Sequence, residues 1–188
     1  MKIFKFLIAG IIAASPLSAA VIYVPSQYSN IQAGIDAASS GDTVLVADGT
    51  YTGSGNKNLD FQGVNRVLMS ENGPADCIID CEYSGRGFFF HSIETESSVI
   101  QGFTIINGYM LDGGGIYCEF SSPTIRNCII ADCQASGAGG GIRIIGFNPQ
   151  IINCTIHNNY ASTGGGLSVT MSDMILNSSI LAANASSG

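Results

Sequence analysis

The sequence predicts an all-β protein built as a parallel β-helix, a solenoid with about 25 residues per coil and a short helix capping its N-terminal end. Three observations carry this prediction: an internal repeat, short runs of β-branched residues inside each repeat, and glycine-rich corners between the runs. Glycine makes up 24 of the 188 residues, and 46% of the residues are hydrophobic against 11% charged. This composition excludes a disordered chain, which needs high charge and few apolar groups.

Residues 1–20 have the pattern of a signal peptide. Lys2 and Lys5 precede an apolar run over 6–14, and the small residues 18–20 are typical of a cleavage site, so we expect cleavage before Val21 and export of the protein. A retained interfacial anchor is the alternative. The run is too short for a permanent membrane helix and no later stretch is long enough, so no membrane span is expected. The net charge of −7 also disfavours a nucleic-acid partner, which requires clustered Lys and Arg.

Residues 21–58 are expected to form the N-terminal cap and the first coil. A strand is predicted at 21–24, and Ser29 is predicted to cap a helix over 30–39 that stops before Gly41. One face of this helix is apolar and consists of Ile31, Ile35 and Ala38. We expect the helix to cover the end of the first coil. An uncovered edge strand has unpaired backbone groups that can pair with other chains.

Residues 59–188 carry the repeats. The segment 123–130 realigns position by position with 149–156, and both segments are followed by a Gly-rich corner. Looser copies begin at Cys77, Val99 and Ile175. The runs are too short for stable helices, so each copy is interpreted as a coil of three short strands, with successive coils about 4.8 Å apart.

Stacking of coils predicts columns of equivalent side chains. Two inward columns are expected, formed by Ile105, Ile130, Ile156 and Ile180 and by Phe103, Cys128, Cys154 and Ser178. Two polar corner columns are expected, formed by Asn127, Asn153 and Asn177 and by Asn107, Asp132 and Asn158. Asn tolerates the left-handed backbone of a sharp corner, so we interpret the polar columns as corner ladders in preference to a ligand face. The Gly triplets are likewise interpreted as tight corners in preference to a phosphate cradle.

Two parts of the sequence resemble known proteins. The segments 31–38 and 41–51 resemble the opening of right-handed parallel β-helix proteins of the pectin-lyase-like class. The element 113–117 and its copies resemble the repeats of polymorphic outer membrane proteins and related bacterial surface proteins, although a regular Phe-x-x-Asn partner is missing. The resemblance covers nearly all of the chain after the signal peptide and implies the fold and a location that is secreted or on the outer cell surface. That fold hosts lyases, hydrolases, esterases and epimerases as well as adhesins and stalks.

The groups that such enzymes use do not occur together in this sequence. The segment 49–53 lacks the acid of a pectinesterase-like Gly-x-Tyr-x-Glu element, and no Asp-Asp pair of the polygalacturonase kind is present. After Lys57 the remaining cations are Arg66, Arg86, Arg126 and Arg143. Arg126 is expected to be a solvated outward side chain in preference to a catalytic base. We therefore assign no catalytic residue, no cofactor and no metal ligand.

Several residues are weaker candidates for a site. They are the acids Asp76, Asp80, Glu82 and Asp112, the histidines His91 and His157, and the tyrosines Tyr117 and Tyr160. The acids fall short of the six to eight oxygens of a calcium site, so solvated charge is the favoured interpretation. Neither histidine has a partner arrangement typical of a catalytic triad. Either tyrosine could stack on a sugar ring, but a lone aromatic is more often ordinary surface or core.

The six cysteines are expected to be mostly buried thiols. They are Cys77, Cys81, Cys118, Cys128, Cys133 and Cys154. Export would permit disulfides, but cysteines in stacked coils lie about 4.8 Å apart, whereas a disulfide prefers Cβ atoms about 3.8 Å apart. No cysteine and histidine spacing typical of a zinc site is present.

Three functions remain open from the sequence. The favoured one is a non-catalytic stalk or adhesin-like module of an exported protein, with a polysaccharide or a cell-surface ligand as the expected partner. The second is the N-terminal part of a polysaccharide lyase, hydrolase or epimerase whose active site lies in further C-terminal coils. Gly188 aligns with the start of another Gly-rich corner, so we expect the chain to be the front piece of a longer protein or a truncated product. The third is a sugar-binding module, which would need a column of aromatic residues along one face, and the sequence alone reveals none.

Overall fold

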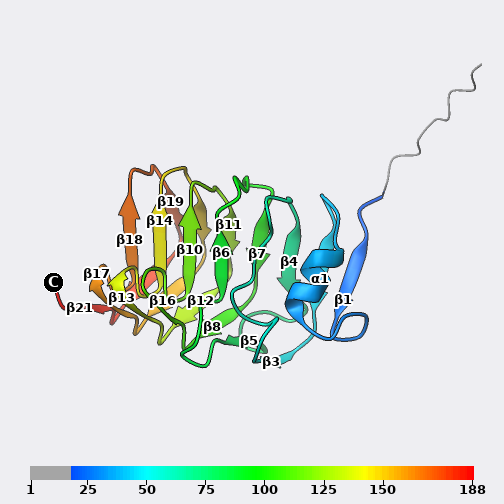
Figure 1. Ribbon diagram of the computed structural model, residues 1–188, viewed down its shortest axis with the longest axis horizontal. Coiled ribbons are helices and arrows are strands. Elements are labelled where there is room, and N and C mark those ends of the chain that lie inside the picture. Colours follow the sequence, from blue (N-terminus) through cyan, green and yellow to red (C-terminus); the bar gives the residue numbers. More distant parts are fainter. Residues whose placement is uncertain (1–17) are drawn as a thin grey trace, which may run out of the picture.

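The computed structural model describes residues 18–188, which wind into a parallel β-solenoid with one short helix near its N-terminal end (Figure 1). Residues 1–17 of the expected signal peptide lie outside the described residues. Thr124 pairs with Gln150 in the next coil, and Gln150 pairs with Ile175 in the coil after that. The predicted parallel β-helix and its period are therefore confirmed. Within residues 18–188 no helix has the length and apolar character that a membrane crossing requires.

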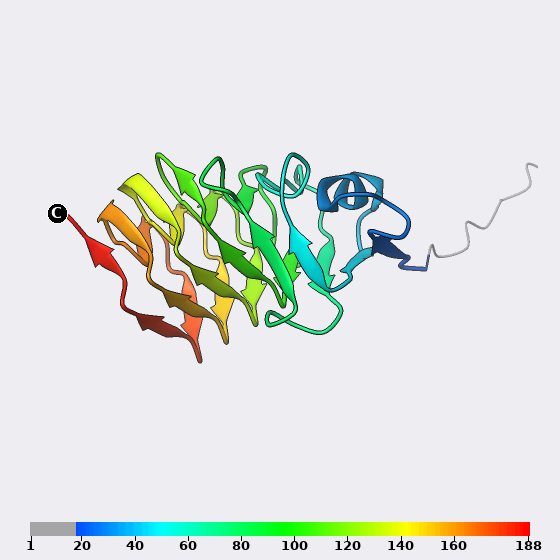
Figure 2. The same ribbon diagram turned by 90° about the horizontal axis from the view of Figure 1, so that it is seen from below.

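The strands stack into four parallel sheets that run along the solenoid (Figures 1 and 2). Sheet A contains β1 (Val21–Val24), β2 (Thr43–Val46), β4 (Val67–Ser70), β7 (Val99–Gln101), β11 (Thr124–Arg126), β15 (Gln150–Ile152) and β19 (Ile175–Asn177). Sheet B contains β3 (Gly49–Tyr51), β5 (Cys77–Asp80), β8 (Thr104–Ile106), β12 (Ile129–Ala131), β16 (Thr155–His157) and β20 (Ile180–Ala182). Sheet C contains β6 (Phe88–Phe90), β10 (Ile116–Glu119), β14 (Ile142–Ile145) and β18 (Leu167–Thr170). Sheet D contains β9 (Tyr109–Met110), β13 (Gln134–Ala138), β17 (Tyr160–Thr163) and β21 (Ala185–Ser186).

Sheet D corrects the prediction of three strands per coil. Its strand β13 is rich in Gly and Ala, which the sequence pattern assigns to a corner. It forms because the left-handed residue Asp132 (φ 54°) turns the chain directly into a new extended segment. Gln134 of that segment pairs with Tyr109 in the preceding coil and with Tyr160 in the following one. The backbone groups of this short segment are thus satisfied by neighbouring coils.

The interior is filled by inward side chains from stacked strands. Ile105, Ile130 and Ile156 pair in register and are fully buried, and Phe103, Cys128 and Cys154 are also buried, as predicted. The predicted fourth members lie one position too early. Leu181, not Ile180, pairs with Ile156, and Ser179 Oγ accepts a hydrogen bond from the Cys154 amide at 3.0 Å. The register shift in the pairing of β13 with β17 shortens the next coil by one residue, whereas the predicted columns assume a coil two residues shorter.

The corner columns consist of residues with left-handed backbone. Asn127 and Asn153 have φ of 51° and 53°, and the Asn153 Nδ2 atom donates to Asn127 Oδ1 at 2.6 Å. The next member is Ser178 (φ 48°), not Asn177, which pairs with Ile152 inside sheet A. The second column is confirmed, with positive φ at Asn107, Asp132 and Asn158.

The helix α1 (Ile31–Ala37) closes the N-terminal end of the interior. Its N-cap is Asn30, not Ser29, because the Asn30 side chain accepts from the Ala33 amide, and the helix ends at Ala37. Ile31 and Ile35 are fully buried and belong to the core. The Gln32 amide donates to Gly55 O, so the helix lies against the first coil, as predicted.

The last coil leaves core positions exposed. Leu176 pairs with the fully buried Ile151 and Leu181 with the fully buried Ile156, yet both leucines are 44% exposed. Val169, which pairs with the fully buried Ile144, is 40% exposed. In the part of the chain that the structure describes, apolar side chains at this end of the stack therefore face solvent.

Candidate functional site

The outward face of sheet C carries a column of aromatic and cationic side chains. Phe88 and Phe90 point inward and are buried, so the residue between them, Phe89, points outward. Strand register places Tyr117 beside Phe89 and Arg143 beside Tyr117. All three side chains are half-buried, so the face is both supported by the fold and open to solvent.

The aromatic rings of this face form a stack. The centres of the Phe89 and Tyr117 rings lie 5.2 Å apart with planes inclined by 19°, and the His91 ring lies 4.1 Å from that of Phe89 at 20°. Stacked rings on paired strands have little freedom to move. The stack is therefore a preorganised contact surface.

Arg86 lies against this stack. Its guanidinium carbon is 4.9 Å from the centre of the Phe89 ring and 5.0 Å from that of Tyr117, which is the geometry of a cation–π contact. The residue is 8% exposed, and its Nη1 atom has no hydrogen-bond partner among the described residues. Burial lowers the pKa of Arg86, whereas Tyr117, Asp112 and Glu119 act in the opposite direction.

Arg143 extends the cationic character across the next strand. Its Nη1 atom donates to Ser168 Oγ at 2.7 Å and to Thr170 Oγ1 at 2.9 Å, both on β18. Among the described residues Lys57 pairs with Glu82 and the His91 ring contacts Asp60, so neither Arg86 nor Arg143 is paired with a carboxylate there. The face thus combines the buried guanidinium of Arg86 and the half-buried Arg143 with aromatic rings. We call Arg86, Phe89, His91, Tyr117 and Arg143 the aromatic face.

A family model described as the right handed beta helix region matches residues 26–180. The chain belongs to the right-handed β-helix family. No curated protein and no solved structure matches the chain. Membership of this family establishes the winding of the chain, whereas function must be argued from the residues that the coils display.

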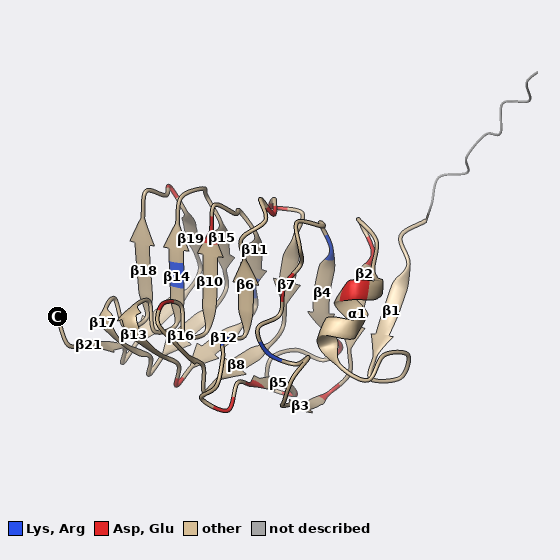
Figure 3. Ribbon diagram, in the orientation of Figure 1, with Lys and Arg blue, Asp and Glu red and all other residues tan. Residues whose placement is uncertain are grey.

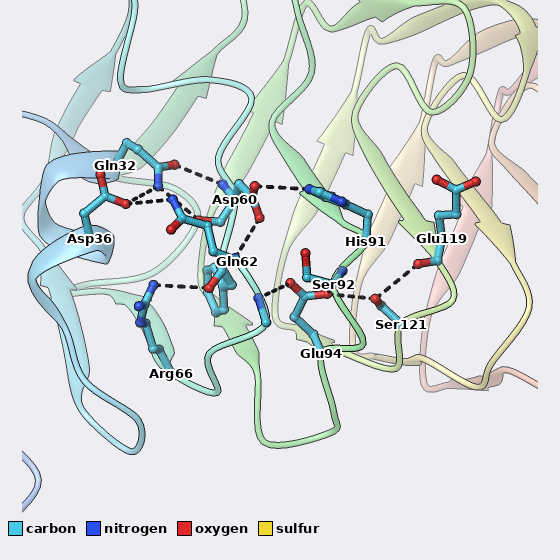
Figure 4. A network of polar contacts seen from close by, with 12 residues as sticks. Gln32, Asp36, Asp60, Gln62, Arg66, His91, Ser92, Glu94, Glu119 and Ser121 are labelled. Carbon is cyan, nitrogen blue, oxygen red and sulfur yellow. Dashed lines mark hydrogen bonds and ion pairs between the residues drawn. The ribbon is translucent and has the colours of Figure 1, made fainter.

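In this right-handed β-helix, one edge of the aromatic face is tied to the N-terminal coils by polar contacts (Figure 4). His91 Nε2 lies 3.1 Å from Asp60 Oδ2, and the Asp60 amide donates to Gln32 on the helix α1. Gln32 also donates to Asp36. These contacts position the His91 ring on Phe89 and connect the face to the cap.

A buried carboxylate supports the turn that follows β6. Glu94 is 1% exposed and accepts hydrogen bonds from the Gly63 amide, the Ser92 amide and the Ser121 hydroxyl (Figure 4). Burial by itself would raise the pKa of Glu94, but these hydrogen bonds outweigh it and lower the pKa. Glu94 is therefore an ionised anchor of the turn.

The aromatic face is suited to binding. Aromatic rings offer rigid contact area at a low entropy cost, and guanidinium groups donate to carboxylate and hydroxyl oxygens. Within residues 18–188 no group of three His, Cys, Asp or Glu side chains is placed to hold a metal ion, and no pocket is enclosed.

The acidic candidates from the sequence serve the backbone and one ion pair. Glu82 pairs with Lys57 at 2.7 Å, and the Asp80 carboxylate accepts from the Glu82 amide and from Asn107. Asp112 accepts from the Ala138 amide in the next coil. Asp80, Glu82 and Asp112 thus support the folding of the coils, whereas Asp76 is exposed.

The other candidates are dispersed over the surface. Arg126 is exposed, as expected. Tyr160 is exposed on sheet D, and His157 is half-buried on sheet B, whereas His91 and Tyr117 belong to the aromatic face. The six cysteines are all buried, and none of them forms a disulfide in the structure.

The sequence interpretation missed the aromatic face. It treats Tyr117 as a lone aromatic, although Tyr117 lies beside Phe89 of the preceding coil. The alternation of Phe88, Phe89 and Phe90 was the available signal, because a middle residue of such a strand must point outward. Phe89 and Tyr117 are farther apart in the sequence than equivalent residues of the best-aligned repeats, so the repeat alignment did not pair them.

Proposed function

We propose that this right-handed β-helix is a non-catalytic, adhesin-like module of an exported protein, which binds a polysaccharide or another cell-surface ligand through the aromatic face. The location proposed is secreted or on the outer cell surface, after removal of a signal peptide. The observation that carries the proposal is the stack of Phe89 on Tyr117 with the guanidinium of Arg86 against both rings. Tyr and Arg are the side chains that most often dominate binding surfaces.

The expected ligand is an extended chain lying across β6, β10 and β14. Its apolar ring faces would contact the open edges of the Phe89 and Tyr117 rings, and its oxygens would accept from Arg86 and Arg143. The side chains are held by strand register and stacking, so little conformational entropy is lost on binding.

Binding of the protein to immobilised neutral and acidic polysaccharides tests the proposal. We expect retention on at least one of them, and a loss of affinity of about tenfold or more for Tyr117→Ala. Tyr160→Ala is the matched control, because Tyr160 is an exposed tyrosine on sheet D, outside the aromatic face. Equal affinity of both variants, or no retention on any polysaccharide, would contradict the proposal.

The alternative function is the N-terminal part of a polysaccharide lyase, hydrolase or epimerase. The right-handed β-helix fold supports such enzymes as well as binding modules, so membership of the family is compatible with both functions. An assay for hydrolysis or lyase products on acidic polysaccharides, with the full-length protein, separates the two functions. Turnover would overturn the non-catalytic proposal.

A further inference from the structure

A second surface runs along the corner that follows the strands of sheet C. Four bulky apolar residues in the turns after β6, β10, β14 and β18 are strongly exposed. They are Ile93 (69% exposed), Phe120 (48%), Phe147 (46%) and Met171 (76%). Successive coils repeat about every 4.8 Å, so these side chains follow one another along the solenoid. We call these four residues the apolar ridge.

The backbone of the apolar ridge is in a region that bulky side chains avoid. The φ angles are 64° at Ile93, 46° at Phe120, 42° at Phe147 and 53° at Met171. A left-handed φ is most unusual for a β-branched residue and is accepted far more readily by Gly or Asn. The corners between sheets A and B place Asn127 and Asn153 at such positions. Folding of the sheet C corners therefore does not require bulky apolar residues.

The ridge is continuous at its centre. The Phe120 amide donates to Ile145 O in the next coil, and the Phe120 and Phe147 ring centres lie 6.2 Å apart at 81°. The Phe120 ring also lies over Gly146, where an added Cβ would approach its Cδ1 atom to 2.6 Å. These contacts restrain the two exposed rings relative to each other, so they form a preorganised apolar surface.

The surroundings of the ridge are acidic. Glu96 and Asp173 belong to the same turns, and Glu119 precedes Phe120 directly. The turn segments 91–98, 120–123, 146–149 and 171–174 contain no Lys or Arg. Figure 3 shows acidic segments along the upper edge, where the strands of sheet C end. A second copy of this chain would bring carboxylates against carboxylates, whereas a cationic partner would complement them.

We propose that the apolar ridge docks a polypeptide segment whose apolar side chains are flanked by Lys and Arg. Exposed apolar patches with charged rims mark protein interaction sites, and the rim charge selects the partner. This inference is independent of the aromatic face, because the two surfaces share no residue.

A pair of synthetic amphipathic peptides tests the proposal: one of leucine and lysine, and one of leucine and glutamate in the same pattern. We expect the lysine peptide to bind the protein, with an affinity that falls as salt rises, and the glutamate peptide to bind at least about tenfold more weakly. The double variant Phe120→Asn/Phe147→Asn should lose affinity for the lysine peptide by about tenfold or more. Its melting temperature should equal or exceed that of the unmodified protein, because Asn accepts the left-handed backbone.

Tyr109→Asn/Tyr160→Asn is the matched control, since it removes two exposed aromatics from sheet D. It should retain binding of the lysine peptide. The proposal is overturned by equal binding of the two peptides, by undiminished binding to the ridge variant, or by a melting temperature of that variant several degrees lower. Stronger association with cationic lipid vesicles than with the lysine peptide would also overturn it. Polysaccharide retention by the ridge variant should be unchanged, which separates this test from that of the proposed function.

Discussion

The guanidinium carbon of Arg86 lies 5.0 Å from the centre of the Tyr117 ring, although the two residues belong to successive coils. Arg86 is buried against the Phe89 and Tyr117 rings and has no ion pair among the described residues. A buried cation without a carboxylate partner is costly, and cation–π contacts offset only part of that cost. Such an arrangement is better explained by ligand binding than by a contribution to stability.

The substitution Arg86→Met separates these two roles. Met keeps the apolar contact with Phe89 and Tyr117 and removes the desolvated charge, so the free energy of unfolding should stay within about 1 kcal/mol or rise. Affinity for the retained polysaccharide should fall. Urea denaturation of the variant beside the unmodified protein measures the first effect. A loss of stability above about 3 kcal/mol would instead assign Arg86 to the fold.

The sequence was sufficient to predict the solenoid, because stacked coils place similar side chains at equivalent positions. Ile130 and Ile156 were aligned correctly by their spacing, and their burial follows from that spacing. The bulge in β13 could not be seen, since its Gly and Ala residues fit either a corner or a strand. The register shift shortens the last coil by one residue, whereas the predicted columns that include Asn177 and Ile180 assume a shortening by two.

The aromatic face was not predicted because its members are brought together by register alone. The spacing from Phe89 to Tyr117 is longer than the spacing of the best-aligned repeats, so these two residues do not align in the repeat pattern. Arg86 reaches both rings from the segment before β6, and nothing in the repeat pattern indicates the direction of that side chain. Contacts between coils of unequal length therefore require the structure.

The corrected register predicts unequal effects for two asparagines. Asn153→Ala places a Cβ-bearing residue without local hydrogen bonding at φ 53° and removes the bond to Asn127, so it should destabilise the protein by about 1–2 kcal/mol. Asn177→Ala should change stability by less than about 0.5 kcal/mol, because Asn177 is exposed on an extended strand. Chemical denaturation of both variants measures the difference. Similar losses would contradict the assignment of Ser178 to the corner.

The buried thiols should resist alkylation while the protein is folded. Burial raises the pKa of Cys77 and of Cys133 to about 12, and it also raises the pKa of Cys118. The reactive species is the thiolate, which is scarce near neutral pH when the pKa is this high. Mass spectrometry after iodoacetamide treatment should find these three thiols unmodified in buffer and modified in guanidinium chloride. Rapid labelling of any of them in buffer would show that its coil opens.

The buried, ionised carboxylate of Glu94 should make the turn beside the aromatic face sensitive to acid. The lowered pKa of Glu94 means that its ionised form stabilises the folded protein above the ordinary value of 4.5, and that this stabilisation is lost as pH falls through the lower folded value. Glu94→Gln leaves an amide donor facing the donors of Gly63, Ser92 or Ser121, so stability at neutral pH should fall by about 2–3 kcal/mol. The variant should also lose stability less steeply than the unmodified protein between about pH 5 and 3.

Glu96→Gln is the matched control for this acid sensitivity, because Glu96 is exposed in the same turn and its substitution should leave both the stability and its pH dependence unchanged. Denaturation curves of the two variants and the unmodified protein across the same acidic range measure both effects. Glu94→Gln should flatten the pH dependence because the group that takes up a proton on unfolding is gone. Parallel curves for Glu94→Gln and the unmodified protein would show that Glu94 does not anchor the turn as an anion.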